Sequence, residues 1–245
     1  MTNLYKSNMR RFFKNIVFVG GCILAFLITL CISSNIFNIA IYQLFGAETM
    51  VLFLGIAMII FATIFVPLFT NGEYRDGVIR NKIVAGFSNS EIYFSHLFAH
   101  MTGAMIMFLC YLAGGILGGA RFNGTELLGL TIFLFALWAY ISVLMLISFR
   151  IQNVIAVVIL AFAILNINWY FMLMGNAFMM LSRGATRFFF SVLYNVFVVG
   201  QWFTHTGFCD EYANPGNGIQ ILLSLAIMAL MVLVANLGLK KRQLK

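Results

Sequence analysis

Residues 127–149, LLGLTIFLFALWAYISVLMLISF, decide the fold class of this chain because they form an apolar run without a charged residue. Glu126 and Arg150 flank this run, and it has the length that an α-helix needs to cross a bilayer. Similar apolar runs recur along the whole chain, at residues 16–38, 50–70, 92–119, 153–175 and 219–239. The sequence therefore predicts an all-α polytopic membrane protein, with six transmembrane helices in one domain over residues 1–245.

The composition supports this class and excludes others. Of the 245 residues, 62% are hydrophobic and 9% are charged, whereas ordinary soluble domains have about 25% charged residues. So few charges cannot cover a water-facing surface, which excludes a soluble enzyme, a disordered regulator and a disulfide-rich secreted scaffold. We expect no nucleic-acid partner despite the net charge of +8, because the basic residues lie at the ends of apolar runs.

The positions of the basic residues predict the topology. One cluster precedes the first apolar run and another follows the last, namely Lys6, Arg10, Arg11 and Lys14, and Lys240, Lys241, Arg242 and Lys245. The positive-inside rule places both clusters in the cytoplasm, which requires an even number of crossings. Six crossings leave twelve of the fifteen Lys and Arg residues inside, whereas a seventh would place the C-terminal cluster outside. We expect both termini to be cytoplasmic.

Two further segments carry an apolar pattern without forming a full span. In residues 1–15, Tyr5, Met9 and Phe12 recur at helical spacing opposite basic residues, which predicts an amphipathic helix in the membrane surface. A simple extension of the first span explains the same pattern equally well. Residues 176–208 are apolar but interrupted by Arg183 and Arg187, so we expect a re-entrant or interfacial helical pair at the outer face before the last span.

The loop at residues 71–91 is the most informative part of the sequence, which reads NGEYRDGVIRNKIVAGFSNSEIYFSH over residues 71–96. Its pattern predicts a short surface helix that presents an outward apolar patch, formed by Val78, Ile79, Ile83 and Val84. A Ser88–Glu91 capping box follows and begins the third span. This helix either only joins two spans or docks a cytoplasmic partner. The residues of the predicted docking helix are Gly77, Val78, Ile79, Arg80, Asn81, Lys82, Ile83 and Val84.

This segment resembles the first cytoplasmic loop of ABC-2 type transporter permeases, the bacterial exporter family that includes bacitracin- and lantibiotic-type systems. The family pattern has an acidic residue and a glycine before a basic helix, then a small turn at the head of the third span. The matching positions are Glu73, Gly77, Ile79, Arg80, Asn81, Lys82, Gly86, Ser88, Ile92, Tyr93 and Ser95. Asn89 departs from the pattern, since these loops often carry a basic residue there.

The resemblance implies the transmembrane permease subunit of an ATP-driven ABC exporter in the bacterial cytoplasmic membrane. Such a subunit moves an amphipathic substrate, an antimicrobial peptide or a lipid-like molecule, by alternating access. The implied partners are two copies of a cytoplasmic ABC ATPase, a second permease subunit that is identical or homologous, and membrane lipids. The alternative is a membrane-embedded immunity or scaffold protein without transport activity of its own.

The residues within the spans bear on this implication. The sequence has no G-x-x-x-x-G-K-[ST] motif, so we expect no enzymatic activity and no cofactor in this chain, with ATP and Mg²⁺ on the ATPase. The expected spans also contain no Asp, Glu, Lys or Arg, which argues against an ion-driven carrier. Uncharged polar residues there either line a substrate path or only bond neighbouring helices: Asn35, Asn38, Asn166 and Asn168.

Two spacings complete the predictions from sequence. The glycines at 114, 115, 118 and 119 form two overlapping GxxxG pairs, which predicts close packing against another helix. His96 and His100 lie four residues apart on one helix face, but no carboxylate lies deeper on that face. We therefore expect no metal site, and we expect the four cysteines to be free thiols.

Overall fold

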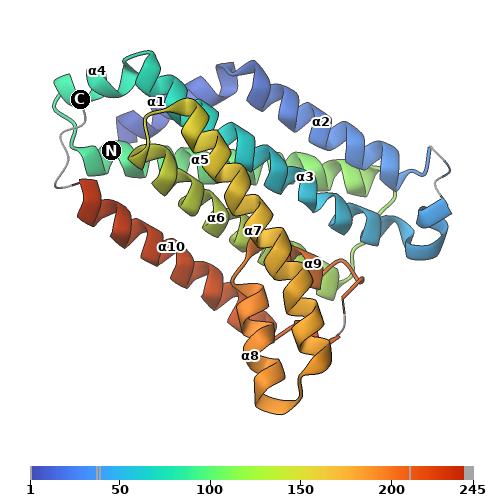
Figure 1. The fold of residues 1–245 in the computed structure, drawn as a ribbon. Helices are drawn as coiled ribbons and strands as arrows, with labels where there is room; N and C mark the ends of the chain where they lie inside the picture. Colours follow the sequence, from blue (N-terminus) through green and yellow to red (C-terminus); the bar gives the residue numbers. More distant parts are fainter. Residues whose placement is uncertain (1, 37, 39, 210, 240–245) are drawn as a thin grey trace.

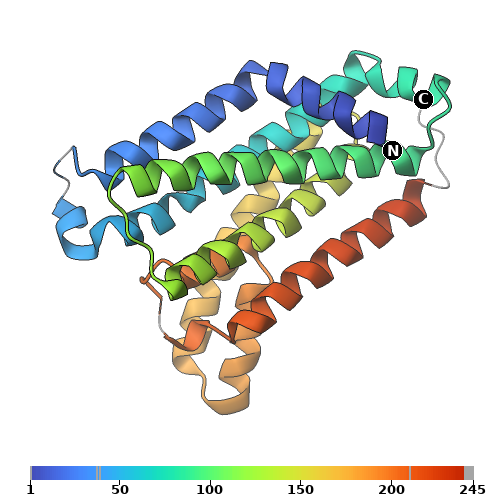
Figure 2. The same ribbon diagram turned by 180° about the vertical axis from the view of Figure 1, so that it is seen from behind.

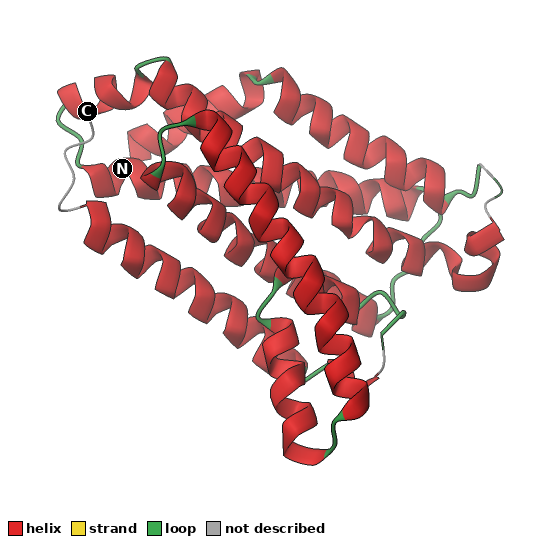
Figure 3. Cartoon of the chain, viewed as in Figure 1, coloured by secondary structure: helices red, strands yellow, loops and turns green. Residues whose placement is uncertain are grey.

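The computed structural model describes residues 2–36, 38, 40–209 and 211–239, and within them every regular element is helical (Figures 1 and 3). The elements are α1 (Thr2–Lys14), α2 (Ile16–Ser33), α3 (Ala40–Arg75), α4 (Val78–Val84), α5 (Asn89–Leu117), α6 (Gly124–Arg150), α7 (Val154–Leu181), α8 (Gly184–Asn195), α9 (Val198–Thr204), the 3₁₀ turn η1 (Glu211–Ala213) and α10 (Asn217–Leu239). Among the described residues, six helices are long and apolar enough to cross a membrane: α2, α3, α5, α6, α7 and α10. The predicted all-α polytopic fold is confirmed.

The bundle has an inner and an outer set of membrane helices. Helices α3, α5 and α6 contribute most of the buried residues, whereas α2, α7 and α10 keep most of their apolar side chains exposed. Helix α2 packs along α5, α10 packs along α6, and α7 crosses α3. Figure 2 shows α7 and α10 diverging from the end of the molecule where α8 lies. Apolar side chains exposed on the outer helices fit a hydrocarbon solvent.

The glycines of α5 bring α2 unusually close. A Cβ atom on Gly114 would lie 2.3 Å from the backbone oxygen of Phe26, and one on Gly118 would lie 2.8 Å from that of Leu30. Thr29 Oγ1 uses this approach to donate a hydrogen bond to the backbone oxygen of Tyr111 at 3.0 Å. The close packing predicted from the GxxxG pairs is confirmed.

The positions of the helix ends agree with an even number of crossings. Helix α1, helix α4 and the last described turn of α10 lie at one end of the bundle, and α8 and α9 lie toward the other (Figures 1 and 2). The basic cluster at residues 240–245 lies outside the described residues. The chain is a multi-pass membrane protein, and a cytoplasmic location of the α1–α4 end stays a prediction.

Helix α1 is a separate helix and not an extension of the first span. The helical conformation is interrupted at Asn15. The Oδ1 atom of Asn15 accepts hydrogen bonds from the backbone N–H groups of Val17 at 2.9 Å and Phe18 at 3.2 Å. This side chain caps α2 and begins a new helix direction. Helix α1 packs on α5 with Leu4 and Phe12 buried, so the helical pattern in residues 1–15 belongs to an element of its own.

Residues 176–208 form two short helices, as predicted, but the segment begins later than expected. Residues 176–181 complete α7, and α8 and α9 follow it. The helical conformation is interrupted between α8 and α9, at residues 196 and 197. There, Gln201 Nε2 donates a hydrogen bond at 2.6 Å to the backbone oxygen of Asn195, at the end of α8. A helix break among apolar residues is tolerated when a side chain satisfies the backbone in this way.

Candidate functional site

The short helix α4 is held between two glycines in the left-handed region. Gly77 precedes α4 with a φ of 70°, and Gly86 follows it with a φ of 88°. Any other residue would be strained there, so the glycines allow the chain to leave α3, form α4 and turn into α5. The predicted capping box is also present, because Ser88 Oγ accepts from the Glu91 N–H and the Glu91 carboxylate accepts from the Ser88 N–H.

The side of α4 that faces the bundle differs from the predicted one. Ile79 is 1% exposed and Lys82 is 8% exposed, whereas Val84 is 80% exposed. Arg80 and Asn81 also lie on the exposed side. At 3.6 residues per turn, residues 79 and 82 share the inner face while 80 and 84 share the outer one. One outward apolar patch is therefore a wrong expectation for Val78, Ile79, Ile83 and Val84.

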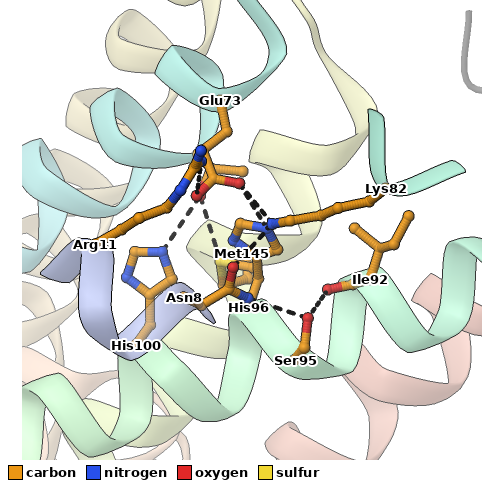
Figure 4. Close-up of polar contacts among 10 residues, drawn as sticks. Asn8, Arg11, Glu73, Lys82, Ile92, Ser95, His96, His100 and Met145 are labelled. Atoms are coloured by element: carbon orange, nitrogen blue, oxygen red, sulfur yellow. Dashed lines mark hydrogen bonds and ion pairs between the residues drawn. The ribbon is translucent and has the colours of Figure 1, made fainter. Parts of the chain in front are cut away.

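Lys82 lies at the centre of a buried ionic cluster (Figure 4). Its Nζ donates to Glu73 Oε2 at 2.8 Å and to Asn8 Oδ1 at 2.8 Å, and lies 2.9 Å from His96 Nε2. An ammonium group has three protons, so these three partners saturate it when His96 Nε2 is unprotonated. Burial lowers the pKa of Lys82, and the Glu73 carboxylate opposes that shift.

Helix α1 closes the cluster from the other side. Arg11 forms an ion pair with Glu73 Oε1 at 3.1 Å, and Asn8 Nδ2 donates to Ser95 Oγ at 3.1 Å. The Glu73 carboxylate therefore lies between two cations, one from α1 and one from α4, while Ser95 and His96 belong to α5. The cluster, defined as Asn8, Arg11, Glu73, Lys82 and His96, joins four helices.

The cluster shows where the sequence analysis failed. Helix α3 continues to Arg75, so the expected span 50–70 is too short and Glu73 lies within the last turn of a membrane helix. Residues 50–70 contain no acidic or basic residue, but the helix that includes them carries Glu73 and Arg75 in its last turn. The sequence feature that could have predicted the cluster is the position of Lys82. This lysine follows Ile79 by three residues, so both lie on the same apolar face of the helix.

His100 lies beside the cluster in an aromatic environment and not in a ligand set. Its ring packs against Phe12 at 4.9 Å and Phe69 at 5.5 Å between centroids, and its Nε2 lies 3.3 Å from Thr70 Oγ1. Within the described ranges, no three His, Cys, Asp or Glu side chains are grouped closely enough to hold a metal ion. The four cysteines are free thiols, as predicted.

The four asparagines proposed as cavity residues do not lie together. Asn35 and Asn38 lie in the loop after α2, with φ of 51° and 46°, because α2 ends at Ser33. Asn166 is exposed and donates to the backbone of its own helix at Phe162, 2.8 Å away. Among these four, Asn168 lines a cavity, a cleft between α6, α7, α9 and α10. The structure therefore places the four asparagines in different surroundings, and a role in a substrate path stays a prediction.

Comparisons with protein-family models, curated proteins and solved structures find no match. The likeness to ABC-2 permeases therefore rests on the residues of the 71–96 segment and on the layout of the helices.

The geometry of the cluster suits the transmission of force better than chemistry. Its charged side chains are paired with one another, and it fixes α4 to α1, α3 and α5 at once. Burying two ions costs several kcal/mol each in desolvation, so such a pair specifies a position more than it adds stability. The cluster therefore connects α4 directly to α1, α3 and α5.

Proposed function

We propose that this chain is the membrane-spanning permease subunit of an ATP-driven exporter, and that α4 docks a separate ATPase. The single observation that carries the proposal is the mounting of α4 on the buried Glu73–Lys82 pair, at 2.8 Å. An isolated helix of seven residues is marginal in water, so α4 depends on this mounting for its shape. The attachment of α4 through this ion pair supports a role in coupling conformational changes of a partner to the membrane helices.

The outward side of α4 offers a surface to such a partner. Arg80, Asn81 and Val84 are exposed, and a hollow of about 310 Å³ lies between α4 and α1. Asn3 and Ser7 line the α1 side of this hollow, and its floor carries the basic groups of the cluster. Its lining combines these polar and basic side chains with Leu4, Val78 and Phe87, and such a mixed surface fits the edge of a soluble protein domain.

The interior of the bundle supports a motor outside the membrane. The acidic and basic residues of the described membrane helices lie near the helix ends, as with Glu48 and Glu73 in α3, Glu91 in α5 and Arg150 in α6. Ion-driven carriers need an ionisable group within the membrane to carry the coupling charge. In this proposal a nucleotide-binding partner supplies the energy, two permease subunits pair, and both chain termini are cytoplasmic.

The test is recovery of an ATPase with the full-length chain purified from its native membranes. We expect copurified ATP hydrolysis, which Val84→Asp and Arg80→Glu reduce by at least about tenfold through loss of an interface anchor. Arg183→Glu is the matched control, because Arg183 is exposed at the opposite end. Ile79→Asp is unsuitable, since it buries a carboxylate.

Equal ATPase recovery with Arg80→Glu and Arg183→Glu would overturn the docking surface. If the chain protects cells from an antimicrobial peptide although no ATPase copurifies with it, the alternative function, a membrane-embedded immunity or scaffold protein, would be supported instead.

The orientation has its own test, in which single cysteines are labelled from either side of sealed cells. We expect Ser7→Cys and Asn81→Cys to react only from the cytoplasm and Thr125→Cys only from outside. All three positions are exposed. Reaction of Asn81→Cys from outside would contradict the proposed location of the ATPase.

A further inference from the structure

A cleft lies between α7 and α10, with α6 as its floor and α9 at one end. Its volume is about 280 Å³, close to the lower end of the range of about 300–1,000 Å³ typical of small-molecule sites. The two bordering helices diverge in Figure 2, and the rim residues Ile164, Leu230 and Met231 are partly or fully exposed. The cleft therefore opens sideways, on the surface that faces hydrocarbon in a bilayer.

Small side chains and helix divergence create this space. Ala136 and Ala139 lie on the floor, where α6 is almost completely buried. Ile227 and Leu230 of α10 form one wall, and Ile164 of α7 belongs to the other. No charged residue belongs to the described lining, so a charged ligand would lose its hydration without a compensating ion.

Most donors of the polar groups in the cleft are used within the protein, but Asn168 Nδ2 has two N–H groups and one acceptor among the described residues. Asn168 Nδ2 donates to the Ile164 backbone oxygen at 2.7 Å, Ser224 Oγ donates to Gln201 Oε1 at 3.1 Å, and Gln201 Nε2 donates to the Asn195 backbone oxygen at 2.6 Å. Oxygen lone pairs remain on Asn168 Oδ1, Gln201 Oε1 and Ser224 Oγ. The cleft therefore offers three acceptor oxygens and one N–H of Asn168, which suits a ligand whose polar head donates more hydrogen bonds than it accepts.

From this chemistry we infer that the cleft binds one uncharged amphiphile, with its hydrocarbon chain between α7 and α10. Its hydroxyl or amide head donates hydrogen bonds to Asn168 and to the Gln201–Ser224 pair. The bilayer supplies such a molecule directly, because the rim lies at the lipid-facing surface. This site is separate from α4 and does not depend on the docking of an ATPase.

The first test uses a photoactivatable monoacylglycerol, with a diazirine in its acyl chain, and the full-length protein in phosphatidylcholine nanodiscs. We expect labelled peptides from the floor of the cleft in α6 and from its wall in α10. Leu230→Trp fills the mouth of the cleft and should reduce this labelling about tenfold, by displacing buried apolar contacts. Leu233→Trp is the matched control, because Leu233 is exposed on the same helix but does not line the cleft.

Labelling that Leu230→Trp leaves unchanged, spread evenly over α2, α7 and α10, would overturn the inference, since it would report ordinary boundary lipid. Efficient disulfide cross-linking of two Leu230→Cys chains would also overturn it, because a second copy would then cover the cleft.

The second test examines the head group. Asn168→Leu removes an acceptor and breaks only a hydrogen bond within α7, so the fold should persist. We expect labelling by the monoacylglycerol to fall about fivefold, which is the effect of losing one neutral hydrogen bond. Labelling by the methyl ester of the same fatty acid, which can accept from Asn168 but cannot donate to it, should fall clearly less. An equal fall for both probes would contradict the assigned head-group contacts.

Discussion

The two ends of the bundle satisfy their buried polar groups in different ways. Under α4, the groups are ions: Lys82 and Glu73 are paired at 2.8 Å and joined by Arg11. Around α9 they are amides: Gln220 Nε2 donates to Asn195 Oδ1 at 2.6 Å, and Gln201 bonds the broken backbone. Ions fix a surface helix near water, whereas amides fix a helix break among apolar residues, where an unpaired charge would be more costly.

The largest effect expected from this comparison is at the ionic end. Glu73→Gln leaves Lys82 buried without a counter-charge, so we expect the free energy of unfolding to fall by about 3–5 kcal/mol. The double variant Glu73→Gln with Lys82→Met should regain most of that loss, because no buried charge remains. Denaturant unfolding in micelles measures both. Equal losses in the single and double variants would show that the two charges are not coupled.

The amide end should respond more weakly. Gln220→Leu removes the hydrogen bond to Asn195 and the contact of its Oε1 with His205 Nε2 at 3.0 Å, so we expect a loss of about 1–2 kcal/mol. Asn166→Leu is the control, since Asn166 is exposed and bonds only its own helix, and it should leave stability unchanged. A loss with Gln220→Leu as large as that of Glu73→Gln would remove the contrast between the two ends.

The same comparison explains what the sequence could predict. Apolar length and local capping are short-range properties, so the six membrane helices, the Ser88–Glu91 box and the interruption before α8 follow from adjacent residues. The ionic cluster joins Asn8 to Lys82 across 74 positions and adds Glu73 and His96 from two other helices. No local pattern encodes such a meeting. The face of α4 was ambiguous for a related reason, because Ile79 and Val84 are both apolar and only packing distinguishes them.

The smallest expected effect concerns the surface that the ionic cluster presents. Val84 is 80% exposed on the outer side of α4, so Val84→Asp adds a charge that water can solvate and breaks no buried contact. We expect the free energy of unfolding to change by no more than about 0.5 kcal/mol. The same micelle unfolding experiment measures this, with Val84→Ile as the control that keeps the side chain apolar. A loss of several kcal/mol would mean that Val84 packs against the protein, and α4 would then have no free outer face. Unchanged stability would make Val84→Asp a clean probe of docking, because any loss of a partner could not arise from unfolding. The outer side of α4 would then be free to bind a partner, while its inner side is held by the ionic cluster.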